Sequence, residues 1–462
     1  MQNKYLLNII TYLLLSTQLF AQEWATTFPT DSVFAGGGMA IGFEVTPAAD
    51  GGYIVAGEID FPTGAIRHNL RLAKTDALGN IEWDTIYEVG NIILQEVKLL
   101  WEQSDGNILI GGNLNGAPFL SQHTSEGEIL WQKQYPSDTS RFVHDGVVDS
   151  NGDVLLVGWA SISPTEPAQL YCAKMNPNGD LLWEKFQAFS GATIANGVDA
   201  TADDGYILVG KIDDVLHLFK LHADGDFQWN KGYNFSTNDE GFTIKQTLDQ
   251  GYIVGGTSVG IANSVPLIFK TDALGDEAWT KMFGDSLMDK INDIALTSDG
   301  GYGVVGSMFS FWSFGNFDGY IAKLDGVGEI EWAQNFASAN KTLAAIQNTT
   351  DGGFIVVGVS SEGMLLEKIG GVITTSEEVR ENIVINIFPN PSSHLVNFKI
   401  EDSKNLTKHL QIFNLAGKRV AEGIFVADTF LFDANKQPAG IYFFQIKNGD
   451  VLLKTGKLTI VR

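Results

Sequence analysis

A unit of about 50 residues recurs along most of this 462-residue chain, and it restricts the possible folds more than any other feature. Each unit begins with a turn such as Asp50-Gly51-Gly52, continues through a strand ending in Lys74-Thr75-Asp76, and closes with a strand carrying Trp83. The turn recurs at residues 105–107, 151–153, 204–206, 250–252, 300–302 and 351–353, which makes seven copies. The tryptophan recurs as Trp131, Trp183, Trp229, Trp279 and Trp332.

The seventh tryptophan strand lies at the opposite end of the repeat region. Residues 22–28, with Trp24, read like residues 81–87, whereas the last unit ends at residues 365–369 without a tryptophan strand of its own. The first strand is therefore expected to complete the last unit. Repeats of this length, with four short apolar strands and a strand shared between the ends, predict an all-β fold, a seven-bladed β-propeller of four-stranded blades.

The repeated residues themselves have structural explanations. Asp-Gly and Asn-Gly pairs supply the positive φ angles of tight hairpin turns, and alternating Ile, Val and Leu supply a buried strand face. A tryptophan needed once in every blade serves the architecture of the blade. We therefore assign the repeat tryptophans to the core and not to ligand binding.

Loops of variable length indicate where a binding site would lie. The connections between second and third strands differ widely among blades (residues 59–68, 159–168, 258–265 and 308–318), and strand alternation places them all on one face, around a central channel. The aromatic candidates for ligand binding on this face are Phe309, Phe311, Trp312, Phe314 and Phe317 in the sixth blade and Trp159 in the third. Aromatic rings stack on sugars or peptides, but the same rings could instead fold back to cap the channel.

Other candidate motifs favour structural roles. Ser258 lies in a Gly-x-Ser-x-Gly pattern, but no helix follows it, as a nucleophile elbow requires. His217 and His222 are five residues apart on one expected strand, so they point to opposite faces. Asp- and Asn-rich turns at 149–153 and 176–180 lack the full ligand spacing of a calcium loop. We expect no catalytic residue, metal or cofactor from these motifs.

Charge and the N-terminal segment limit the possible partners. The chain has 30 Lys and Arg against 55 Asp and Glu, a net charge of −25, which disfavours binding to nucleic acid. A single cysteine, Cys172, excludes an internal disulfide. Residues 1–21 have the layout of a secretory signal peptide with cleavage after Ala21, which leaves no membrane span in the mature chain.

The repeat pattern stops after residue 371, and residues 372–386 read as a polar linker before a separate module at 387–462. From residue 380 onward, 11 Lys and Arg outnumber 7 Asp and Glu, in contrast to the acidic region before it. Alternating strands with Gly and Pro turns predict a small β-sandwich here. Its motif residues are Pro389, Asn390, Pro391, Gly417, Lys418, Pro438, Ala439, Gly440, Tyr442, Lys457 and Leu458.

This ordered pattern resembles the type A C-terminal sorting domain of the type IX secretion system. The resemblance implies that the outer-membrane translocon recognises the domain, and that the domain is then removed or exchanged for a surface lipid-polysaccharide anchor. The repeats at 22–371 likewise resemble the secreted repeat propellers of Bacteroidetes-type bacteria. The expected location is the cell surface or the extracellular space.

These observations predict a non-catalytic binding or adhesion module, with an extracellular polysaccharide or a surface protein as its partner. Two alternatives remain open at this level: a polysaccharide-degrading enzyme with channel carboxylates such as Asp60 or Asp318, and a structural surface protein without a small ligand. Two nearby carboxylates in an open channel would favour the enzyme. An aromatic shelf would favour the binding module, and a plugged channel would favour the structural protein.

Overall fold

The computed structural model divides the chain into two compact units, one of Phe20–Val372 and the other containing Ile373–Arg462. The residues that the structure describes are 22–29, 40–60, 68–87, 94–135, 138–163, 165–260, 264–283, 289–309, 317–336, 341–370, 384–390, 392–401, 408–414, 419–425, 429–448 and 451–461. The expected signal peptide at 1–21 lies outside them. Among the described residues, no helix has the length and apolar character needed to cross a bilayer.

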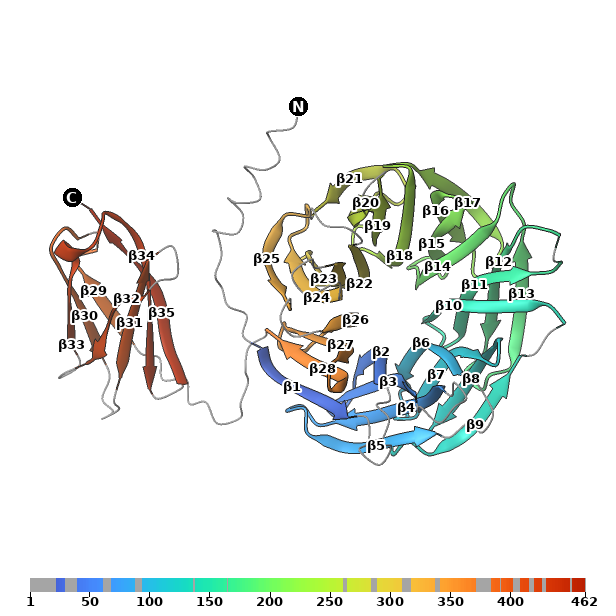
Figure 1. The fold of residues 1–462 in the computed structure, drawn as a ribbon, viewed down its shortest axis with the longest axis horizontal. Coiled ribbons are helices and arrows are strands. Elements are labelled where there is room, and N and C mark those ends of the chain that lie inside the picture. The colour runs from blue at the N-terminus through green and yellow to red at the C-terminus, as the bar shows by residue number, and fades with distance from the viewer. Residues whose placement is uncertain are drawn as a thin grey trace. The chain divides into compact units, whose positions relative to one another are not determined.

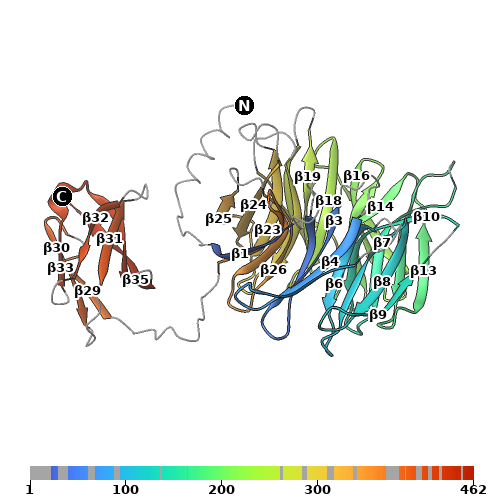
Figure 2. The same ribbon diagram turned by 60° about the horizontal axis from the view of Figure 1, so that its bottom comes forward.

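The first unit is a ring of seven four-stranded antiparallel sheets, which confirms the predicted β-propeller (Figures 1 and 2). The first three blades, from inner to outer strand, are β2 (Ala40–Pro47), β3 (Tyr53–Asp60), β4 (His68–Thr75) and β5 (Ile81–Tyr87); β6 (Leu94–Glu102), β7 (Ile108–Leu114), β8 (Ala117–His123) and β9 (Ile129–Gln134); β10 (Ser140–Val148), β11 (Val154–Ser161), β12 (Gln169–Met175) and β13 (Leu181–Gln187).

The next three blades follow the same order. They are β14 (Thr193–Ala200), β15 (Tyr206–Ile212), β16 (Val215–Leu221) and β17 (Phe227–Tyr233); β18 (Asn238–Gln246), β19 (Tyr252–Val259), β20 (Ser264–Thr271) and β21 (Glu277–Met282); β22 (Lys290–Leu296), β23 (Tyr302–Phe309), β24 (Phe317–Leu324) and β25 (Ile330–Asn335). The buried apolar residues of neighbouring blades form joint clusters, so each blade packs on the next.

The seventh blade combines the two ends of the repeat region. From the inner strand outward, its first three strands are β26 (Thr342–Asn348), β27 (Phe354–Ser360) and β28 (Gly363–Ile369), and its outer strand is β1 (Gln22–Pro29). Strand β1 runs antiparallel to β28, with Gln22 opposite Ile369 and Pro29 opposite Gly363. The N-terminal strand thus supplies the tryptophan strand that the last repeat lacks.

A buried arginine of the first blade holds the end of β1. Arg71, on β4, donates hydrogen bonds to the backbone carbonyls of Phe28 (3.1 Å) and Pro29 (2.9 Å). The same guanidinium forms a two-pronged ion pair with Asp84 on β5, at 2.9 and 2.6 Å. Arg71 is 2% exposed, so these bonds are made largely out of water, where their loss would leave a buried charge unpaired.

The repeat tryptophans lie between blades. Except for Trp332, which is buried in a cluster with Phe354, the ring of each one lies against the positive-φ glycine in the turn between the third and fourth strands of the next blade. The pairs are Trp24 with Gly79, Trp83 with Gly127, Trp131 with Gly179, Trp183 with Gly225, Trp229 with Gly275, and Trp279 with Gly328. These six tryptophans are half-buried, because the ring covers the turn from outside. Glycine is required here both for its φ angle and because a side chain would meet the ring.

Replacement of Gly225 by alanine should therefore destabilise the propeller. The φ of Gly225 is +80°, and a Cβ there would lie 2.6 Å from the Trp183 ring. Gly106 has a φ of +83° but open space around its Cβ position, so Gly106→Ala measures the backbone strain alone. We expect losses of about 2–4 kcal/mol for Gly225→Ala and about 1 kcal/mol for Gly106→Ala in urea unfolding. Equal losses would show that the tryptophan contact contributes nothing.

The lysine of the Lys-Thr-Asp element has a role that its repetition alone did not indicate. In six blades it is buried against the Asp of the turn between the first and second strands, as in the Lys270–Asp249 and Lys220–Asp203 pairs, both at 2.9 Å. The others are Lys74–Asp50, Lys174–Asp149, Lys323–Asp299 and Lys368–Asp351. The second blade replaces the ion pair with a hydrogen bond from Gln122 to Gln103. These pairs tie the turn to the third strand in every blade.

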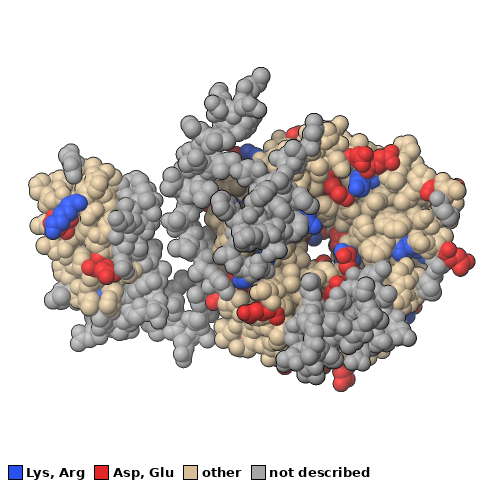
Figure 3. Space-filling model, viewed as in Figure 1, with Lys and Arg blue, Asp and Glu red and all other residues tan. Residues whose placement is uncertain are grey.

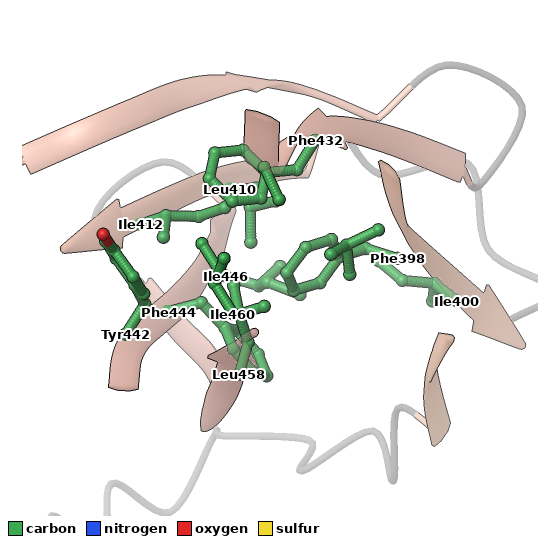
Figure 4. Packing of buried hydrophobic residues seen from close by; sticks show 12 residues of the cluster. Phe398, Ile400, Leu410, Ile412, Phe432, Tyr442, Phe444, Ile446, Leu458 and Ile460 are labelled. Atoms are coloured by element: carbon green, nitrogen blue, oxygen red, sulfur yellow. The ribbon is translucent and has the colours of Figure 1, made fainter. Parts of the chain in front are cut away.

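The second unit contains two antiparallel sheets. One consists of β29 (Val384–Phe388), β30 (Leu395–Glu401) and β33 (Thr429–Asp433), and the other of β32 (Arg419–Ile424), β31 (His409–Asn414), β34 (Gly440–Asn448) and β35 (Val451–Ile460). A short 3₁₀ helix, η2 (Ala434–Lys436), follows β33. Both sheets contribute to one apolar core, with Phe398 from the first and Phe444 from the second in edge contact at 5.1 Å (Figure 4). This arrangement is the predicted small β-sandwich.

Several motif residues of this unit have structural contacts. The Tyr442 hydroxyl donates to the backbone carbonyl of Pro438 at 2.8 Å, and the Asn390 side chain accepts from the backbone N–H of Thr459 at 2.8 Å. Leu458 is fully buried. The motif residues Pro391, Gly417 and Lys418 lie outside the described residues.

Candidate binding site

The two faces of the propeller differ in their connections. Each inner strand starts at one face and ends in an Asp-Gly-type turn at the other, so the turns at 48–52 and 103–107 share a face. We call this the turn face. We call the opposite face, where the first and third strands of each blade start and the second and fourth strands end, the link face.

A channel of about 1060 Å³ passes between the inner strands. Its lining runs from Glu96 and Lys290, near the starts of their strands, to Trp101 and Gln347, near the ends, so the cavity extends along the strands from one face toward the other. Charged groups of both signs lie near the middle of the propeller in the space-filling view (Figure 3). The volume is at the upper end of the range of small-molecule sites.

Each of the seven inner strands has a β-bulge at the equivalent position. The register with the second strand shifts at this position in every blade, with one additional shift between Leu94 and Glu96 in the second blade, and the seven residues at the equivalent position all line the channel. We call them the bulge ring: Phe43, Lys98, His144, Asn196, Phe242, Asn292 and Ala344. A bulge places an extra residue on one strand and redirects its side chain. The backbone feature is thus repeated while the side chain differs from blade to blade.

Acidic residues follow the bulge in three blades, and two of them join neighbouring blades. Asp145 accepts hydrogen bonds from the backbone N–H groups of Gly146 and, in the next blade, Val198, both at 2.8 Å. Asp293 accepts from Ile294 at 2.8 Å and from Ile346 of the next blade at 3.0 Å. Both carboxylates therefore satisfy backbone donors at the channel wall.

Glu44 occupies the same position in the first blade but makes no hydrogen bond or ion pair with any residue that the structure describes. Burial and, secondarily, the carboxylates of Asp293 and Asp145 raise the pKa of Glu44 from 4.5 to about 8. The Lys245 ammonium group lies near these carboxylates. Burial lowers the pKa of Lys245, but the charges of Asp199, Asp293 and the other carboxylates raise it, and the resulting pKa lies above the ordinary value. Lys245 also lacks an ion pair within the described part of the chain.

Stability should depend on pH through Glu44. Between about pH 4.5 and pH 8 the unfolded chain loses the Glu44 proton whereas the folded chain keeps it, so the free energy of unfolding falls as pH rises. Glu44→Gln removes this contribution. The free energy of unfolding of the variant, relative to that of wild type, should therefore be about 2 kcal/mol higher at pH 8.5 than at pH 4. Urea unfolding at both pH values tests this. A difference that does not change with pH would contradict the assignment.

Nearer the link face, a chain of polar contacts crosses three blades. His144 Nδ1 and Asn196 Oδ1 are 3.0 Å apart, and Asn196 Nδ2 donates to Glu240 Oε1 at 3.2 Å. Burial lowers the pKa of His144, which favours its neutral form. Lys290 is exposed in the channel and lies 5.3 Å from the Phe242 ring centre, with no ion pair to any described residue.

The structure places only part of the aromatic set proposed from the sequence. Trp159, near the link-face end of β11, is half-buried and stacks on Phe142, with ring centres 6.3 Å apart and an interplanar angle of 16°. Phe142 lines the channel, so Trp159 contacts a residue of the lining. Phe309 and Phe317 pair at the ends of β23 and β24, and their side chains lie outside the described part of the structure. Phe311, Trp312 and Phe314 lie wholly outside it.

The other sequence candidates lie on second and third strands of their blades. Asp60 is in β3 and Asp318 in β24, and the side chains of both lie outside the described part of the structure. Ser258 is 2% exposed and donates to Asp239 Oδ1 at 2.6 Å, which gives it a structural role. Cys172 is buried, and burial raises its thiol pKa. Among the described residues, no group of three or more His, Cys, Asp or Glu could hold a metal.

The sequence did not reveal the bulge ring or Glu44. The only available signal was a break in the two-residue apolar alternation of each inner strand, as at Val143-His144-Asp145. Such a break is visible only when all seven units are aligned, because each strand is short.

Comparison with known proteins identifies the second unit. Residues 386–461 match the family described as the secretion system C-terminal sorting domain. This match confirms the predicted type IX sorting domain and, with it, export to the cell surface or the extracellular space. No curated protein matches the sequence.

Solved structures with a similar fold are distant in sequence. PorZ, a surface component of the type IX secretion system of Porphyromonas gingivalis, is 10% identical with a TM-score of 0.46; the match covers 90% of this chain and 58% of PorZ. A protein of unknown function from Dyadobacter fermentans is 10% identical with a TM-score of 0.46, over 76% of this chain and 99% of that one. The NanB sialidase of Streptococcus pneumoniae is 9% identical with a TM-score of 0.41, over 74% and 70% of the two chains.

Proposed function

We propose that the exported protein is a non-catalytic binding module whose ligand enters the central channel from the link face. The bulge ring is the observation that carries this proposal. A bulge repeated in every blade keeps seven side chains directed at one space, and their variation from phenylalanine to lysine to asparagine suits recognition. A merely architectural position would keep one residue type, as the tryptophans do.

The aromatic residues at the link face extend this site. We propose that Phe309, Phe311, Trp312, Phe314 and Phe317 of the sixth blade act with Trp159 of the third as a contact surface at the channel mouth. The stacking of Trp159 on Phe142 supports this proposal, because it brings a link-face ring against a residue of the channel lining.

Backbone hydrogen bonds to two of the channel carboxylates favour a binding role over glycoside cleavage. Cleavage needs an acid and a second carboxylate that are both free to reach the substrate. Asp145 and Asp293 instead have both oxygens engaged with backbone N–H groups, which would have to be released. Glu44 is the acid of this layer that remains available.

The test measures binding of the full mature chain to a panel of polysaccharides and cell-surface proteins, with chromatography to detect products. Trp312→Ala should weaken binding at least tenfold without any product being formed. Lys133→Ala, at an exposed ion pair on an outer strand, serves as the control and should bind like wild type. Product release that survives Trp312→Ala would favour an enzyme, and an absence of binding would favour a structural surface protein.

A further inference from the structure

The inner strands offer a poor template for an extended peptide. A peptide that adds to a sheet needs a regular strand edge with free backbone groups. Each inner strand is instead interrupted by its bulge, and backbone N–H groups such as those of Val198 and Ile346 already donate to Asp145 and Asp293 of the preceding blade. Recognition in the channel must therefore depend on side chains.

The channel side chains that have no ion-pair partner among the described residues include both a carboxyl group and ammonium groups. Glu44, Lys245 and Lys290 all line the cavity, and none makes an ion pair with a described residue. Hydroxyl groups can donate to the carboxyl oxygen and accept from both ammonium groups, so a neutral ligand can satisfy all three.

The net charge of the lining disfavours a polyanion. Glu44 stays protonated at neutral pH, but five other acidic residues among the described lining, namely Glu96, Asp145, Asp149, Glu240 and Asp293, still outnumber the three lysines Lys98, Lys245 and Lys290. A polymer with many carboxylates or phosphates would meet net repulsion.

Aromatic rings complete the set of groups. Phe142, with Trp159 stacked on it, and Phe242 lie at the level of the bulge ring or nearer the link face. Flat apolar ring faces suit the C–H faces of pyranose rings, while the polar groups suit their hydroxyls.

We infer that the channel binds a segment of a neutral, hydroxyl-rich glycan through Glu44, Lys290 and the aromatic residues Phe142 and Phe242. This inference rests on the proposed binding function and adds the class of ligand. Lys290 and Glu44 donate and accept hydrogen bonds with hydroxyls, and the phenylalanine rings pack against sugar faces.

The experiment is calorimetric titration of the full mature chain with neutral hexasaccharides of glucose, mannose, galactose and xylose. Polygalacturonate serves as the polyanion and reduced, carboxymethylated α-lactalbumin as an unfolded polypeptide. At least one neutral hexasaccharide should bind, and Lys290→Ala and Glu44→Ala should each weaken it at least tenfold. Lys231→Ala, at an exposed ion pair on β17, should leave the affinity within twofold. Circular dichroism and thermal unfolding check that the variants are folded.

The outcomes separate this inference from the function on which it rests. Binding of α-lactalbumin or polygalacturonate in place of the hexasaccharides, lost in Lys290→Ala, would overturn the glycan but keep the channel as a binding site. Hexasaccharide binding that neither Lys290→Ala nor Glu44→Ala weakens would overturn the channel as its location. No binding to any probe would overturn both.

Discussion

A chain that lacks residues 387–462 is expected to fold its propeller, accumulate in the periplasm and be absent from the cell surface. Among the described residues, the apolar clusters of the propeller consist of residues between Trp24 and Ile369, and the apolar cluster of the sorting domain consists of its own residues. Each unit therefore has a hydrophobic core of its own. Because the sorting domain marks the chain for type IX export, its removal should stop the final step and leave the fold intact.

Surface labelling of intact cells and proteolysis of the periplasmic fraction test this result together. The loss from the surface should be at least tenfold, and the periplasmic protein should resist protease as the wild-type propeller does. A reporter with a signal peptide and residues 387–462 at its C-terminus should in turn reach the surface. Normal surface levels of the truncated chain would contradict the sorting assignment.

Deletion of residues 22–29 should have the largest effect on stability. Strand β1 covers β28 along its length, and the side chain of Phe28 is fully buried in the cluster between the last and first blades. Loss of Phe28 alone should cost about 3–5 kcal/mol. Deletion also removes the carbonyl partners of Arg71 and exposes the edge of β28. The total approaches the whole stability of a typical domain.

The measurement is urea unfolding followed by tryptophan fluorescence, with aggregation monitored by light scattering. A matched control moves residues 22–29 to a position after Gly370, joined by a short Asn-Gly turn. Since Gln22 lies opposite Ile369, this chain can form the same strand pairing as a hairpin, and it should regain most of the lost stability. A deletion variant as stable as wild type would show that β1 does not hold the ring together.

Much of the fold followed from local signals. The Asp-Gly turns predicted the hairpins because tight turns demand positive φ, and seven copies predicted seven blades. The likeness of residues 22–28 to 81–87 predicted that the N-terminal strand would complete the seventh blade, where β1 pairs with β28. The turn and strand motifs of residues 387–462 were equally sufficient for the sorting domain, whose identity the family match confirms.

The contacts between repeats could not be predicted from the sequence. The repeat tryptophans were assigned to the core, but six of them lie half-buried across the junctions between blades, against a glycine of the next unit. The lysine of each Lys-Thr-Asp element was visible as a repeat, yet its pairing with the turn aspartate depends on how three strands align. Both features need the geometry of a formed blade.

The sequence by itself determined the blade count, the order of strands, the shared seventh blade and the export domain, because each depends on residues close together or on a pattern repeated many times. The tertiary structure decided which side chains face the channel. Residues such as Glu44, Asp145 and Asp293 come together from different blades, far apart in the chain. The bulges that direct the neighbouring side chains inward depend on strand register, which arises only when the inner strands pair.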